Sequence, residues 1–124
     1  MQLAPDTHGR ANVVQGYAPG ELRLRDRVLT SSAILTATEV LPWQASSAAT
    51  LTPEVLEPVL GLAVEVVLLA TGARQVWPAP AVLAHVAARG VGLEVMDLGA
   101  ACRTFNLLVG DQRKVALAAI LGTS

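Results

Sequence analysis

Hydrophobic positions change their spacing about halfway along the chain. In the first half, Leu22 and Leu24 stand between charged residues and follow a Pro19-Gly20 turn. Alternation of this kind, broken by short turns, is typical of antiparallel strands. Pro42 interrupts the apolar stretch at residues 40–43, which favours an edge strand there. We therefore predict strands near residues 13–14, 22–24 and 28–29, and an edge strand over residues 40–43.

The second half alternates apolar runs with helical periodicity. Asp97 is the predicted N-cap of a helix whose apolar residues, starting at Leu98, recur at i, i+3, i+4 and i+7. A helix opening at Thr52-Pro53 is expected to kink or end early, because Pro58 interrupts it. The pattern predicts strands over residues 63–70, 92–96 and 115–121, and a helix over residues 80–89.

Strand, helix, strand, helix, strand is the order that produces parallel pairing through right-handed crossovers. Together with the antiparallel first half, it predicts one compact α/β domain with a mixed sheet. The length of 124 residues fits one domain. Residues 1–11 are polar and aperiodic, so we expect a flexible N-terminal arm there and the folded domain over residues 12–124.

Composition excludes several classes of protein. Hydrophobic residues make up 52% of the chain, too many for a disordered protein. A net charge of −1 and only 3% aromatic residues argue against nucleic-acid binding. The longest apolar run, residues 66–70, is far short of the roughly 20 residues that span a membrane. The single cysteine, Cys102, allows no internal disulfide, and with no secretory signal at the start we expect a cytoplasmic protein.

One edge of the predicted sheet is a candidate ligand site. Parallel strands ending near residues 70 and 96 would bring their carboxyl ends together beside the start of the third helix. Such crevices bind ligands in open α/β sheets, and helix N-termini favour anions. The alternative is that Thr71-Gly72 is only a turn and Asp97 only a cap. The candidate residues are Thr71, Gly72, Arg74, Asp97, Arg103, Thr104 and Asn106.

Glu94 and Glu65 lie within apolar strands. A buried carboxylate is costly unless it is paired, so each should meet a cation or water. Arg103 lies off the apolar stripe of the following helix and is the first choice of partner for Glu94, with Arg113 second. We expect a structural Glu94–Arg103 ion pair, and Arg103→Ala should then cost about 3–5 kcal/mol if the pair is buried.

No set of residues predicts catalysis. Cys102 falls on an apolar helical stripe, where a thiol stays protonated and inert. His85 is expected to face solvent, and no cluster of His, Cys, Asp and Glu has the spacing of a metal site. The chain has no G-x-G-x-x-G, no Walker pattern and no G-x-S-x-G. We therefore predict no catalytic residue, no metal and no cofactor.

The segment 90–108 nevertheless resembles a known family. It contains Glu94-x-Met96-Asp97, then Ala101-Cys102-Arg103-Thr104-x-Asn106, which is long enough to be specific. The likeness extends over residues 17–121, through Tyr17, Pro19-Gly20, Ser31-Ser32, Pro42-Trp43, Thr71-Gly72 and Arg113. The family is a small α/β domain of unknown function that includes a mitochondrial assembly factor of respiratory complex I.

The resemblance implies a three-layer α/β fold with a mixed central sheet and an additional β-layer. It implies no reaction and no cofactor. Two positions depart from the family pattern: Ala70 stands in place of a glycine, and Leu98 in place of a threonine after Asp97. Any family site that used that glycine or that hydroxyl would be altered in this chain.

Two functions remain open at this stage. The first is a non-catalytic protein-interaction or assembly-factor-like domain with a protein partner, suggested by the resemblance and by the very apolar composition. The second is a small-molecule site, for an anion or an enzyme substrate, in the crevice. A shallow apolar crevice favours the first, and a deep polar pocket with a perturbed carboxylate favours the second.

Overall fold

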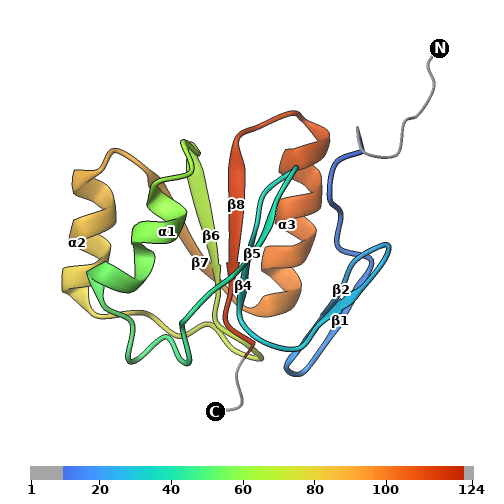
Figure 1. Ribbon diagram of the computed structural model, residues 1–124. Helices are drawn as coiled ribbons and strands as arrows, with labels where there is room; N and C mark the ends of the chain where they lie inside the picture. The colour runs from blue at the N-terminus through green and yellow to red at the C-terminus, as the bar shows by residue number, and fades with distance from the viewer. Residues whose placement is uncertain (1–9, 122–124) are drawn as a thin grey trace.

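The protein has three layers, with a five-stranded mixed sheet in the middle (Figure 1). The computed structural model describes residues 10–121. The first nine residues of the predicted arm lie outside this range. The five strands of the central sheet are β4 (Ala33–Leu35), β5 (Val40–Pro42), β6 (Val66–Ala70), β7 (Gly92–Met96) and β8 (Val115–Ala119).

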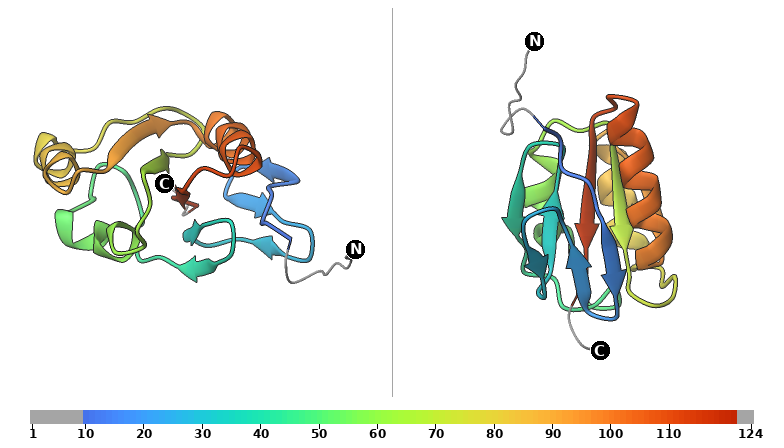
Figure 2. Two further views of the ribbon diagram at one scale, coloured as in Figure 1. Left: turned by 90° about the horizontal axis from the view of Figure 1, so that it is seen from above. Right: turned by 90° about the vertical axis from the view of Figure 1, so that its right-hand side faces the viewer.

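Helices and a second sheet cover the two faces of the central sheet. On one face lie the 3₁₀ turn η2 (Pro53–Leu56), α1 (Glu57–Leu60) and α2 (Pro80–Ala88). On the other face, α3 (Leu98–Gly110) lies beside a small antiparallel sheet (Figure 2). That sheet has the order β1-β2-β3, from β1 (Gly16–Ala18), β2 (Glu21–Arg23) and β3 (Val28–Leu29). The predicted α/β class, mixed sheet and extra antiparallel layer are confirmed.

The last strand, β8, is the centre of the sheet, whose order is β5-β4-β8-β6-β7. It pairs parallel with β6 and antiparallel with β4, and β6 also pairs parallel with β7. Every residue of β8 is buried, so its alanines serve as small residues between two covering layers rather than as helix formers. The strand predicted at residues 115–121 is confirmed over Val115–Ala119.

The alternation of side chains along β6 and β8 divides the core in two. Leu68 and Leu117 pack with Phe105 of α3 and Leu22 of β2. Residues one position away point to the opposite face, where Leu69 joins the cluster beneath α1 and α2. Within residues 10–121, no helix is both long and apolar enough to cross a bilayer.

Several element boundaries differ from the sequence prediction. β6 begins at Val66 instead of residue 63, because Ala63 has a φ of +57° and cannot be part of an extended strand. The helical segment after Thr52 is divided into η2 and α1 and ends at Leu60, in agreement with the early break predicted at Pro58. Pro58 occupies the first turn of α1, where its missing N–H costs nothing.

In the first half, β1 starts at Gly16, beyond the strand predicted near residues 13–14, and the sequence pattern did not predict β4. Its three residues are all buried, so they show no alternation. Residues 13–14 are not a strand. The edge strand predicted over residues 40–43 is present as β5, with Pro42 at its end.

Candidate functional site

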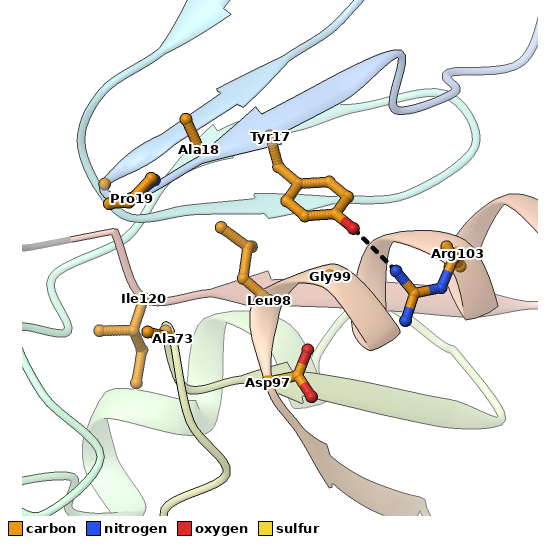
Figure 3. A pocket seen from close by; sticks show the side chains of 11 residues that line it. Tyr17, Ala18, Pro19, Ala73, Asp97, Leu98, Gly99, Arg103 and Ile120 are labelled. Carbon is orange, nitrogen blue, oxygen red and sulfur yellow. Dashed lines mark hydrogen bonds between the residues drawn. The ribbon is translucent and has the colours of Figure 1, made fainter.

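A cavity of about 620 Å³ opens at the edge of the sheet where β6, β7 and β8 end (Figure 3). Four segments meet there: the β1–β2 turn, the loop after β6, the first turn of α3 and the residue after β8. Its lining is mostly apolar. The lining residues are Tyr17, Ala18, Pro19, Gly20, Gly72, Ala73, Asp97, Leu98, Gly99, Arg103 and Ile120.

The first turn of α3 is held by Asp97 and by the loop after β6. The Asp97 carboxylate accepts a hydrogen bond from the Ala100 N–H at 2.9 Å, as an N-cap does. The Leu98 N–H donates to the Gly72 carbonyl at 2.7 Å. A negative charge therefore already stands at this helix N-terminus, and a free anion would have to compete with it. The cap predicted at Asp97 is confirmed.

Tyr17 joins the small sheet to α3. It pairs across the sheet with the fully buried Leu22, so both side chains point toward α3. The ring lies over Gly99, where an added Cβ would come within 2.7 Å of the phenol oxygen. That oxygen accepts a hydrogen bond from Arg103 Nη1 at 2.7 Å (Figure 3). Tyr17 remains 43% exposed and forms one wall of the cavity.

The loop after β6 is organised by Thr71. Its hydroxyl donates to the Arg74 carbonyl at 2.6 Å and accepts from the Val76 N–H at 3.0 Å. Gly72 follows with a φ of +101°, a conformation open to glycine and strained for other residues. Thr71 and Arg74 line a neighbouring cavity of about 400 Å³, which shares Gly72, Ala73 and Ile120 with the first.

Two of the predicted site residues have other roles. The Thr104 hydroxyl donates to the Ala100 carbonyl at 2.8 Å, within α3. Asn106 accepts from the Val14 N–H at 2.8 Å and donates to the Val14 carbonyl at 2.9 Å. These two hydrogen bonds explain why Val14 is not part of a strand, since the Asn106 side chain satisfies both backbone groups of that residue. Gly72, Asp97 and Arg103 line the larger cavity, whereas Thr104 and Asn106 do not.

The expected Glu94–Arg103 ion pair is not formed. Glu94 is exposed on β7, and none of the four ion pairs within residues 10–121 includes either side chain. The reason is the position of α3 between β7 and β1 (Figure 2). Arg103 is on the flank that faces β1, so it reaches Tyr17 instead. Glu65, which lies just before β6 and not within it, pairs with Arg113 at 3.1 Å, and both side chains are half exposed.

Among the described residues, the lining of the cavity contains no cysteine, histidine, serine or lysine. Burial raises the pKa of the Cys102 thiol to about 12, which outweighs the opposite effect of the Arg103 charge. Within the described range, no three His, Cys, Asp or Glu side chains gather as metal ligands would. His85 is half-buried rather than fully exposed, and its Nε2 lies 2.7 Å from Glu57 on the far side of the sheet.

The hairpin tip is the part of the cavity that sequence reasoning missed. Tyr17, Pro19 and Gly20 come from a turn that is more than fifty residues from the next lining segment. The family resemblance already included Tyr17 and Pro19-Gly20, and this was the one signal that marked them. Hydrophobic spacing could not do so, because it does not specify which end of the sheet a hairpin covers.

Comparison with known proteins places these features in a wider group. The family described as "Protein of unknown function (DUF498/DUF598)" matches residues 14–120. A protein of Francisella tularensis subsp. holarctica named "13 kDa major membrane protein" is 29% identical over 102 residues, which are 81% of this chain and 83% of that protein. NADH dehydrogenase (ubiquinone) 1 alpha subcomplex assembly factor 3 of Danio rerio is 30% identical over 114 residues, covering 87% of this chain. The match spans 63% of that relative's length.

Solved structures have the same architecture. A protein of Xanthomonas campestris superposes with a TM-score of 0.85 at 36% identity, covering 98% of this chain and 93% of that one. A Bordetella pertussis protein described as an Mth938-like domain superposes with a TM-score of 0.79 at 27% identity, covering 100% and 94%. The fold is therefore the Mth938-like α/β fold.

Proposed function

This chain belongs to the family of proteins of unknown function described as DUF498/DUF598, and from that premise we propose that it is a non-catalytic, assembly-factor-like domain that binds another protein. The bound segment would occupy the cavity between the β1–β2 turn and the start of α3. A cytoplasmic site of action is part of the proposal, on the ground of the lone cysteine.

The character of the cavity supports this function. Its walls are apolar, from Pro19, Leu98 and Ile120, and the partly exposed Tyr17 stands at its border. Tyrosine and arginine side by side at an apolar depression are typical of the residues that dominate protein interfaces. The Asp97 carboxylate is already used as the cap of α3, and Arg103 is oriented by its hydrogen bond to Tyr17.

The relative from Danio rerio supports a role in binding other proteins. Its name describes an assembly factor, and proteins of that kind act by binding other proteins. The shared region is the domain described above. We carry over only the general mode of action, binding without reaction, and not the complex on which the relative acts.

A small-molecule site is the second candidate, and one observation favours it. A volume of about 620 Å³ is within the range of about 300–1,000 Å³ that is common for ligand pockets. Against an anionic ligand stands the Asp97 carboxylate at the helix N-terminus. Against an enzyme stands the lack of a free acid–base pair among the described lining residues.

Site-specific photocrosslinking in the native host tests the proposal. Benzoylphenylalanine at Ala73, which is exposed and lines the cavity, should crosslink reproducibly to one host protein. The matched control is the same replacement at Ala84, which is exposed on α2. The proposal fails if Ala73 crosslinks no protein, or the same proteins as Ala84. A metabolite retained by the purified protein in native mass spectrometry would then support the second candidate.

A further inference from the structure

Resting on the proposed function, we propose that the segment bound in this cavity carries a carboxylate next to a large apolar side chain. The carboxylate would pair with Arg103, and the apolar side chain would lie against Leu98 and Ile120. The partner is thus defined by an acidic–apolar pair of residues, either within its chain or as an apolar residue at its C-terminus.

Within residues 10–121, Arg103 carries a charge that no ion pair neutralises. Its side-chain bond goes to the Tyr17 hydroxyl, a neutral acceptor that orients the guanidinium without cancelling its charge. The other amino group points away from Tyr17 (Figure 3). A guanidinium held in this way is prepared for a carboxylate, which it can bind through two parallel hydrogen bonds.

The neighbouring charges also favour an acidic segment. Asp97 is the one acid among the lining residues, and its carboxylate is used by the N-terminus of α3. The adjoining cavity adds Arg74, which is exposed and takes part in no ion pair among the described residues. Two arginines and one aspartate therefore border the joined cavities. A lysine or arginine in the bound segment would be repelled.

The apolar walls exclude a bare inorganic anion as the best occupant. Leu98 and Ile120 each belong to one of the two core clusters and also line the cavity. Because the core holds them in place, they form a fixed apolar wall. Pro19 and the Tyr17 ring close the other side. A free phosphate would leave these walls in water, whereas an apolar side chain beside the carboxylate covers them.

A phage-displayed library of random linear peptides, selected on the intact protein, tests the inference. We expect the enriched peptides to share Asp or Glu beside Leu, Ile, Met or Phe, or a C-terminal apolar residue. Affinity of a synthetic copy should fall about tenfold or more for Arg103→Gln, as for the loss of a charged hydrogen bond. The control Arg27→Gln removes an exposed arginine from the β2–β3 turn and should leave affinity unchanged.

A second pair of variants locates the binding site. Ala73→Trp fills the cavity and should abolish binding, whereas Ala84→Trp on α2 should not. Peptides without an acidic group, no enrichment, or equal affinity for Arg103→Gln would each overturn the inference. If photocrosslinking at Ala73 still captures one host protein in that case, the proposed function stands and only the chemistry of the partner is wrong. If neither experiment finds a partner, both proposals fall.

Discussion

At the scale of single residues, Arg103 has a different partner in the structure from the one expected from the sequence. Its partner is a phenol hydroxyl at the surface and not a strand carboxylate. An exposed hydrogen bond contributes far less than a buried ion pair, whose disruption costs about 3–5 kcal/mol. The role of Arg103 in stability should therefore be small.

A double-mutant cycle checks this role. We expect Arg103→Ala to lower the free energy of unfolding by about 1 kcal/mol, and its coupling to Tyr17→Phe to be about 0.5–1.5 kcal/mol. Urea unfolding of the two single variants and the double variant measures both values. A loss of about 3 kcal/mol or more, or a strong coupling of Arg103→Ala to Glu94→Gln, would restore the ion pair expected from the sequence.

Cys102 is predicted to be unreactive in the folded protein. It is 2% exposed, and a pKa of about 12 leaves almost no thiolate near neutral pH. A thiol reagent such as dithionitrobenzoate should therefore modify it only after denaturant is added. Fast and complete modification of the native protein would contradict the buried position.

At the scale of elements, Asn106 connects α3 to the segment before β1. The two residues in contact, Asn106 and Val14, are 92 positions apart, so this amide fixes the path by which the chain enters the small sheet. It thereby also helps to place the hairpin tip over the cavity.

Asn106→Ala should destabilise the protein by about 1–3 kcal/mol, because it leaves the Val14 N–H and carbonyl without their partner. Thermal unfolding measures the loss, and amide exchange should accelerate most at Val14. Thr104→Ala is the control on the same helix, since the Thr104 hydroxyl bonds only to the Ala100 carbonyl of its own helix. Equal effects of the two substitutions would mean that the tether to Val14 is unimportant.

Glu57 connects α1 to α2 through His85 and Arg89. The Arg89 hydrogen bond, followed by that of His85, holds the Glu57 pKa below its ordinary value of 4.5. A lowered pKa for an acid means that stability is present above the unfolded pKa and is lost as pH falls through the folded one. The contribution should therefore be complete near neutral pH and absent in strong acid.

Glu57→Gln should consequently lower the melting temperature at about pH 6, and the effect should become smaller as the pH falls below 4.5. Scanning calorimetry of both proteins across this range measures the difference. Glu54→Gln, an exposed acid in the preceding turn η2, is the matched control. A difference between Glu57→Gln and wild type that persists in acid would show that the charge of Glu57 is not responsible.

At the scale of the whole molecule, the open edge of the central sheet needs protection. β7 is an edge strand, and Glu94 is exposed on it. Charged residues on edge strands prevent pairing with a second copy of the chain. This role accounts for a carboxylate in an otherwise apolar strand without any ion pair.

Glu94→Val should therefore promote self-association while leaving the fold intact. Size-exclusion chromatography with light scattering should show larger species that increase with concentration, with unchanged circular dichroism. Glu54→Val also removes one exposed carboxylate but lies in η2, so it should remain like wild type. If both variants behave alike, net charge rather than the strand edge controls association.

Elements with local signals could be predicted from the amino-acid sequence. The cap at Asp97, the apolar stripe of α3 with the buried Cys102, and the parallel strands β6, β7 and β8 follow from spacing and composition alone. They do so because periodicity reports which side of an element is buried, whatever that element packs against. The sheet edge where Gly72, Asp97 and Arg103 meet was predictable for the same reason.

The contacts between groups of different layers could not be predicted in this way. Arg103 contacts Tyr17 because it lies on the flank of α3 that faces the small sheet. Asn106 contacts Val14 because the segment before β1 passes beside α3. The hairpin tip turns an open sheet edge into a cavity. The physical reason is that these contacts depend on the packing of distant segments. A helical period shows that Arg103 is off the buried stripe but not which neighbour stands on that side.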